Sequence, residues 1–305
     1  MILNSIWYQS ICIFIFGLIV GSFLNVLINR TIAGESIISP ASKCPKCQSK
    51  LLWWHNIPIL SYFILKGKCY FCHSPISIQY PIVEILNAGL YVLLWQKFNN
   101  VGMWILACAF VSLFLTLSVM DIKLKKISVK IASLLILVSL LFNYNNILSS
   151  ILAGVAVLAF IFISKKIIDK VFQQEVLGEG DIYLLVAVAC FVGIKMTPIV
   201  ILLAFIIQAL VCAPEIFKCI IDEKKYVVGF SFIWFAHMYA LLILDKFAFI
   251  NLKTHEKIVI FVNLLASLYI VCKFLFLRIK NLKIVTTAPF APSIFISSLI
   301  YLFLT

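Results

Sequence analysis

Residues 105–121 read ILACAFVSLFLTLSVMD, a largely apolar stretch that ends in a single aspartate. It shows no period-2 alternation, so a half-buried strand is excluded and a helix buried on all sides is favoured. With the four residues before it, the stretch reaches the roughly 20 residues that a helix needs to cross the hydrocarbon core of a bilayer. The sequence therefore predicts a membrane helix with an ionisable group at its end.

The rest of the chain repeats this pattern. It has 305 residues, of which 64% are hydrophobic and 12% charged, and its mean hydropathy of +1.12 lies far outside the range of soluble proteins. We expect an all-α, polytopic membrane helix bundle of about eight to ten transmembrane helices. The first stretch has no basic residue before it and no cleavage site after it, so it should remain as a span. The predicted spans are 6–28, 81–96, 101–120, 128–143, 147–164, 182–194, 196–217, 226–245, 256–278 and 287–304.

The net charge of +13 is distributed over short loops between these spans. Lys and Arg in such loops mark the cytoplasmic side, and they predict that the loop at 30–79 is cytoplasmic. The connection 246–257 disagrees with this topology, because it carries three lysines on the predicted outer side. No basic face with interleaved aromatic residues is present, so membrane lipid is an expected partner and nucleic acid is not.

The loop at 30–79 contains two CxxC pairs, Cys44 with Cys47 and Cys69 with Cys72, separated by 21 residues. Four thiolates can close a tetrahedral shell around one Zn²⁺ ion, as in structural zinc sites. Disulfides are the weaker interpretation, since thiols stay reduced in the cytoplasm. We therefore expect a structural zinc ion that stabilises a loop too small to build its own core.

Two of the five aspartates, Asp121 and Asp181, lie where apolar segments meet cytoplasmic loops. Helix capping or a helix-end charge would explain either one alone, but the topology brings both to one face. Two carboxylates that share a site hold one proton between them. Such a pair suits amide hydrolysis, because one member takes a proton from water while the other donates one. Gly178 and Gly180 would let an extended substrate approach the backbone.

Glu84 is a third carboxylate inside an apolar segment. It fits a buried, hydrogen-bonded group near a helix start about as well as a contact to a substrate amine or a methyl donor. A competing hypothesis is a proton-coupled membrane transporter that uses Asp121, Asp181 and Glu84. A third is a zinc-stabilised assembly factor without catalysis.

Several motifs together resemble the type IV prepilin peptidases, bifunctional membrane enzymes that cleave prepilin leaders and methylate the new N-terminus. The resemblance rests on the two CxxC pairs, Asp121 and the segments Gly21-Ser22-Phe23-Leu24-Asn25-Val26, Asn56-Ile57-Pro58, Pro75-Ile76-Ser77, Tyr80-Pro81 with Glu84, Gly178-Glu179-Gly180-Asp181-Ile182 and Pro289-Phe290-Ala291-Pro292.

This resemblance implies an aspartyl endopeptidase in the bacterial inner membrane, with Asp121 and Asp181 as catalytic residues on the cytoplasmic side. It also implies prepilin or pseudopilin substrates with basic leaders, and methyl transfer from S-adenosylmethionine; the alternative is a peptidase that has lost the methyltransferase activity. The implied domains are a first transmembrane helix (1–29), the zinc loop (30–79) within a methyltransferase-type region that extends to about 96, and a peptidase bundle (80–305) with a two-helix insertion at 222–280. The chain departs from the family at Tyr183, where lysine is common, at Ala291, where glycine is usual, and at Ser128, where proline is usual.

Overall fold

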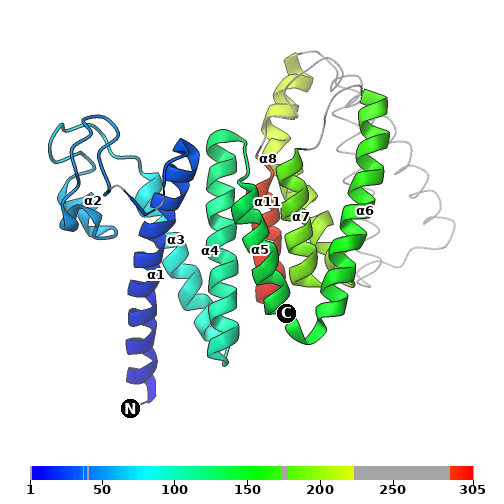
Figure 1. Cartoon of the computed structure of the whole chain (residues 1–305), viewed down its shortest axis with the longest axis horizontal. Coiled ribbons are helices and arrows are strands. Elements are labelled where there is room, and N and C mark those ends of the chain that lie inside the picture. Colours follow the sequence, from blue (N-terminus) through cyan, green and yellow to red (C-terminus); the bar gives the residue numbers. More distant parts are fainter. Residues whose placement is uncertain (1, 37, 40, 173–177, 223–288, 305) are drawn as a thin grey trace. The chain divides into compact units, whose positions relative to one another are not determined.

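The computed structural model describes residues 2–36, 38–39, 41–172, 178–222 and 289–304, which form helices and turns without a strand (Figure 1). The predicted all-α class is confirmed over this part of the chain. The longer helices are α1 (Ile2–Ala33), α3 (Gln79–Lys97), α4 (Val101–Leu124), α5 (Val129–Phe142), α6 (Ile147–Phe172), α7 (Glu179–Val192), α8 (Thr197–Asp222) and α11 (Ala291–Leu304), and the short ones are η1 (Trp53–Asn56), α2 (Leu60–Ile64) and η2 (Tyr144–Asn146).

Eight of the ten predicted spans coincide with these helices, within a few residues at most ends. The spans predicted at 226–245 and 256–278, and with them nearly all of the predicted insertion, lie outside the described residues. Among those described, Trp7–Ala33, Val101–Leu124 and Tyr144–Lys166 are long and apolar enough to cross a membrane.

The chain divides into two compact units. The first comprises Met1–Ile167, Leu177–Phe205 and Pro289–Thr305, and the second comprises Ile168–Val176 and Ile206–Ala288. All the sites described below belong to the first unit.

Helices α1 and α3 pack closely because glycines on α1 face the backbone of α3. A Cβ atom added to Gly17 would lie 2.6 Å from the Cα of Ala88, and one added to Gly21 would lie 2.7 Å from the Cα of Glu84. Asn87 also donates a hydrogen bond of 2.9 Å to the Gly17 carbonyl. The four-residue spacing of the two glycines therefore fixes how α1 lies against α3.

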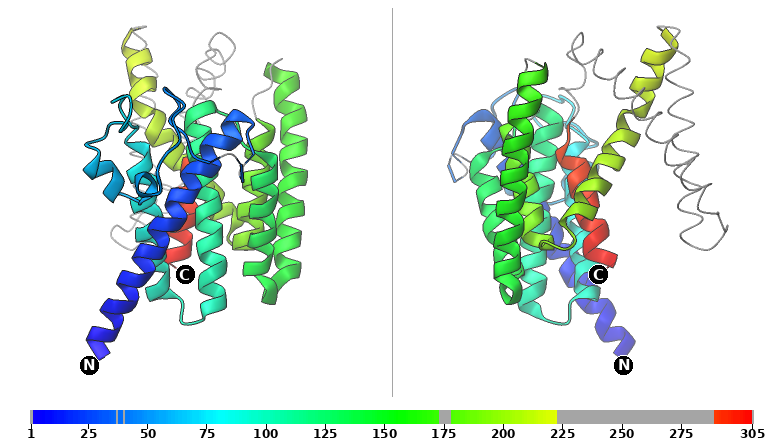
Figure 2. Two further views of the ribbon diagram at one scale, coloured as in Figure 1. Left: turned by 60° about the vertical axis from the view of Figure 1, so that its left-hand side comes forward. Right: turned by 90° about the vertical axis from the view of Figure 1, so that its right-hand side faces the viewer.

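Helix α4 is the centre of the first unit and contacts α1, α3, α5 and α11. Helix α11 also packs on α7, and Figure 2 shows α11 against its neighbours from two further directions. Aromatic rings connect these helices: Phe110 of α4 stacks on Phe191 of α7 at 3.9 Å, and Phe114 of α4 stacks on Phe295 of α11 at 5.2 Å. The buried rings hold α7 and α11 on α4, which carries Asp121 near its end.

Local signals set both ends of α4. The Asn100 side chain accepts hydrogen bonds from the backbone N–H groups of Gly102 and Met103, as a helix N-cap does. At the other end, Lys125 adopts a left-handed conformation with φ 54°, and its N–H bonds to the Asp121 carbonyl at 2.8 Å. Asp121 therefore occupies the last turn of the helix.

Candidate active site and metal centre

The four cysteines of the loop come together in one cluster. The sulfur atoms of Cys44, Cys47, Cys69 and Cys72 all lie within 4.8 Å of one another, and those of Cys44 and Cys72 are 3.9 Å apart. Four sulfurs bound tetrahedrally to zinc at about 2.3 Å would be about 3.8 Å apart. The cluster is therefore compatible with the predicted zinc site in both donor type and spacing.

The two CxxC turns have nearly the same backbone. Cys44 N–H bonds to the Ser49 carbonyl and Cys69 N–H to the Ser74 carbonyl, at 3.0 and 2.8 Å. The residue after each second cysteine has a positive φ, and short bridges pair Lys43 with Lys50 and Lys68 with Pro75. Both turns have the sequence C-x-x-C-x-S, a repeat that sequence reasoning did not use.

One cysteine of the cluster, Cys72, is favoured as the thiolate. A hydrogen bond with the Ser74 hydroxyl, which lies 3.1 Å from the sulfur, is the main cause that lowers the pKa of Cys72 to about 6. Since the thiolate is the form that binds metal, this contact prepares Cys72 as a ligand near neutral pH.

Glu84 attaches the loop to helix α3. Its carboxylate is buried and accepts a 2.7 Å hydrogen bond from the backbone N–H of Ile59, together with one from the Ser22 hydroxyl. Ile59 has a φ of 60°, an unfavourable conformation for a β-branched residue. The contact with Glu84 stabilises this strained turn and thereby positions the loop.

Asp121 is 6% exposed and lies against the start of α11. Its Oδ2 atom accepts a 2.9 Å hydrogen bond from the backbone N–H of Ala291, and the N–H of Phe290 also bonds to the carboxylate. The late Pro-Phe motif, 170 residues away in sequence, thus lies in direct contact with this aspartate.

Asp181 lies in the first turn of α7, where its N–H bonds to the Gly178 carbonyl at 3.2 Å. It is partly buried, and its carboxylate lies close enough to that of Asp121 for a direct electrostatic interaction. The space beside Gly180 is filled by Ile127, whose Cβ would be 2.6 Å from a Cβ on the glycine. Gly180 therefore serves the packing of α7 on the connection between α4 and α5, and Ile127 occupies the space predicted for an approaching substrate.

A chain of hydrogen bonds shows that the cysteine loop and Asp121 lie at the same end of the first unit. Lys123, two residues after Asp121, donates to the Asn29 side chain of α1, and Asn29 donates to the Tyr80 hydroxyl of α3. Asn25 donates to the Tyr80 carbonyl, next to the loop. The predicted common face of the loop and Asp121 is present in the structure.

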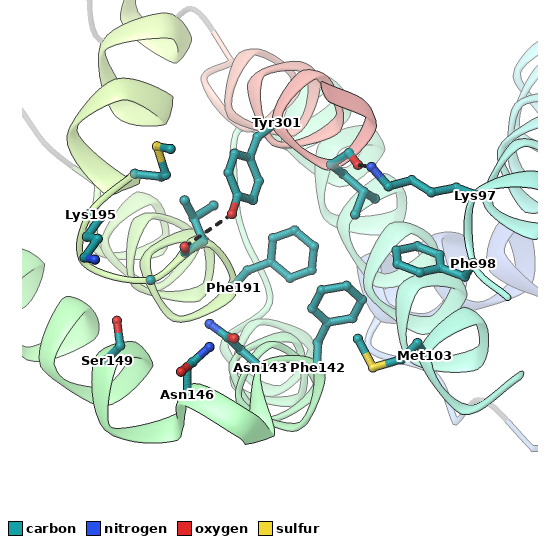
Figure 3. A pocket seen from close by; sticks show the side chains of 14 residues that line it. Lys97, Phe98, Met103, Phe142, Asn143, Asn146, Ser149, Phe191, Lys195 and Tyr301 are labelled. Atoms are coloured by element: carbon teal, nitrogen blue, oxygen red, sulfur yellow. Dashed lines mark hydrogen bonds between the residues drawn. The ribbon is translucent and has the colours of Figure 1, made fainter. Parts of the chain in front are cut away.

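A cavity of about 560 Å³ lies toward the other end of the helices (Figure 3). Met103 in its lining and Asp121 belong to the same helix, 18 residues or about 27 Å apart along its axis. The rings of Phe142, Phe191 and Tyr301 line the cavity, and the sequence did not indicate it. It is too far from the aspartates to be part of their site.

Comparison with known proteins matches two parts of the chain to protein families. Residues 15–98 match the bacterial peptidase A24 N-terminal domain, and residues 108–213 match the type IV leader peptidase family. A prepilin leader peptidase/N-methyltransferase of Vibrio cholerae is 32% identical over 206 residues, which cover 63% of this chain and 81% of the relative. The chain belongs to the type IV leader peptidase family.

Two further relatives carry the same name. That of Neisseria gonorrhoeae is 30% identical over 225 residues, covering 63% of this chain and 77% of the relative. That of Myxococcus xanthus is 36% identical over 186 residues, covering 60% of this chain but only 56% of the relative's length. No solved structure matches the chain significantly.

The family matches include most of the residues singled out from the sequence. The four cysteines and Glu84 fall in the N-terminal match, and Asp121 and Asp181 fall in the peptidase match. The late Pro-Phe motif lies beyond both matches, although it touches Asp121. The backbone donors of Phe290 and Ala291 were missed by sequence reasoning, because any residue except proline supplies an N–H group.

Proposed function

We propose that this chain is a membrane aspartyl endopeptidase that cleaves the basic leaders of type IV prepilins or pseudopilins. The observation that carries the proposal is the proximity of the Asp121 and Asp181 carboxylates, on two different helices at the end of the unit that also carries the cysteine loop. Membership of the type IV leader peptidase family supports the same activity.

The chemistry follows from a carboxyl pair with one proton. The ionised member accepts a proton from water as the water oxygen attacks the scissile carbonyl carbon, and the protonated member donates to the developing oxyanion. Collapse of this intermediate breaks the C–N bond: the carboxyl that took the proton from water gives it to the leaving amine, and the other carboxylate takes a proton from a hydroxyl of the intermediate, which restores the pair with one proton. Both carboxylates must therefore lie within reach of one water molecule. Two carboxylates on α4 and α7 at the same end of the unit can meet this requirement.

We propose N-methylation of the new N-terminus as the second activity, because the relatives bear this name. S-adenosylmethionine would supply an electrophilic methyl group. Glu84, the candidate contact from sequence, already bonds to Ile59 and Ser22, so it does not present a free group to the methyl donor. Its role as a cofactor contact stays a prediction, and we assign no step to it. The loss of methyltransferase activity remains the alternative.

The same proposal places the chain in the bacterial inner membrane among lipids, with the aspartates and the zinc loop on the cytoplasmic side. The three lysines that follow Asp121 within five residues support this orientation, as the positive-inside rule requires. A basic leader that stays in the cytoplasm would then meet the aspartates on its own side.

Separate Asp121→Asn and Asp181→Asn variants test the peptidase, with Glu35→Gln as the matched control. Glu35 is an exposed carboxylate that pairs with Lys43 at 3.8 Å, away from both aspartates in the sequence. Cleavage of purified prepilin should fall at least about 10³-fold in each active-site variant, since neither carboxyl can do both proton transfers, and should be unchanged in the control. Retained cleavage in either Asp variant would exclude the aspartyl mechanism and leave the transporter hypothesis to be examined.

A further inference from the structure

The first turn of α11 directs its backbone donors at Asp121. A helix begins with N–H groups that have no partner within the helix. In the segment 289–292, the two prolines have no N–H, so Phe290 and Ala291 supply the donors there. Both N–H groups bond to the Asp121 carboxylate, the second at 2.9 Å from Oδ2.

These contacts favour one protonation state of that side chain. Backbone N–H groups can only donate, and they bond more strongly to a carboxylate than to a neutral carboxyl group. The N-terminus of a helix also carries partial positive charge, which stabilises a nearby anion. Burial of Asp121 removes water that would stabilise its charge, so the charged form depends on these donors, and water screens their interaction with it little.

Two charged groups bear on the pair. Lys125, next to the end of α4, interacts favourably with the charge on Asp121, and the charge on Asp121 disfavours a second charge on Asp181 of α7. Residues 289–293 at the start of α11 carry no ionisable side chain. The α11 turn therefore acts on Asp121 through its backbone alone.

We propose that the N-terminal turn of α11 holds Asp121 as the ionised member of the pair, so that Asp121 accepts the proton from water and Asp181 carries the shared proton. This inference rests on the proposed peptidase function and assigns the two roles within it. Phe290 and Ala291 are positioning residues: their side chains take no part, and their N–H groups set the charge and orientation of the carboxylate.

The assignment also explains the departure at position 291. A glycine, as is usual in the family, and the alanine of this chain provide the same N–H group, so the exchange preserves the contact. Proline is the residue that cannot replace either.

The test removes a single N–H group and keeps the side chain. L-lactic acid incorporated at position 291 replaces the amide with an ester and deletes the donor to Asp121. The ester analogue of isoleucine at position 294 is the matched control, since the Ile294 N–H bonds to the Phe290 carbonyl within the same helix. Cleavage of a purified prepilin by the full chain in detergent is measured as kcat/KM against pH.

In the 291 ester, we expect the acid limb of the pH profile to move to higher pH by about one unit, the size expected for one lost hydrogen bond to a charged group. The alkaline limb should not move, because it reports loss of the proton on Asp181. The 294 ester should leave both limbs in place. Phenyllactic acid at position 290 removes the second donor and gives an independent measurement if the 291 ester does not fold.

Unchanged limbs in the 290 and 291 esters, or movement of the alkaline limb alone, would overturn the assignment. The second result would mean that Asp121 carries the proton. Both results leave the peptidase proposal intact so long as Asp121→Asn abolishes cleavage, so the two claims fail separately.

Discussion

The packing of α1 on α3 leads to a quantitative prediction for Gly17→Ala. The added Cβ would lie 2.6 Å from the backbone Cα of Ala88, whereas two carbon atoms in favourable contact are about 3.5–4.0 Å apart. Since the obstacle is backbone, it cannot rotate away, and the helices must separate by about 1 Å. The same movement stretches the 2.9 Å hydrogen bond from Asn87 to the Gly17 carbonyl. We expect a loss of about 1–3 kcal/mol in the free energy of unfolding, as for other overpacked interfaces.

The measurement is thermal unfolding of the purified chain in one detergent, where this loss corresponds to a Tm lower by roughly 2–10 °C. Gly89→Ala is the matched control, because among the described residues no atom outside its own stretch of helix backbone lies within 4 Å of the position of its Cβ. It should be neutral or stabilise α3 slightly, since alanine has the higher helix propensity. A Gly17→Ala protein as stable as this control would refute the close packing of the two helices. Gly21→Ala, 2.7 Å from the Glu84 Cα, should cost less when added to Gly17→Ala than alone, since the helices are then already apart.

Three further predictions have different readouts. Ser118→Ala should leave the free energy of unfolding unchanged, because its buried hydroxyl has no hydrogen-bond partner among the described residues. Ser112→Ala removes two hydrogen bonds and should lower the free energy of unfolding by about 1–3 kcal/mol. Equal losses for the two variants in a denaturant titration would contradict this. Gly180→Ala should lower kcat/KM about tenfold or more by pushing the first turn of α7 off Ile127, and wild-type activity would disprove that contact. Removal of zinc by a chelator, or Cys69→Ser, should make the loop sensitive to protease and reduce the metal content measured by emission spectroscopy; a preparation that never contains stoichiometric zinc would exclude the metal site.

Local sequence was sufficient where the chemistry depends on neighbours in the chain. The CxxC pairs predicted the four-cysteine cluster because each pair places two sulfurs on one turn, and only the meeting of the two turns had to be assumed. Asp121 was correctly placed near a helix end, because the length of the apolar stretch before it predicts where α4 ends. Spacing could not indicate the partners of these groups.

Glu84 and Gly180 illustrate the difference. An acid in an apolar helix suggested a buried polar contact or a ligand, and the structure shows that the backbone of Ile59, in the loop, bonds to it. A glycine beside an aspartate suggested room for a substrate, and Ile127 fills that room. In both cases the deciding neighbour is remote from the motif and has no distinctive residue type.

The sequence by itself indicated the membrane environment of this protein, its helical class, the four cysteines that could bind one metal ion and the position of two carboxylates at helix ends. These properties follow from composition and short spacings, because hydrocarbon permits few backbone structures and metal geometry few ligand patterns. Only the tertiary structure decided that Asp121 receives the backbone N–H groups of α11 and lies near Asp181. That arrangement depends on the packing of apolar helix faces, which bring together residues far apart in the chain.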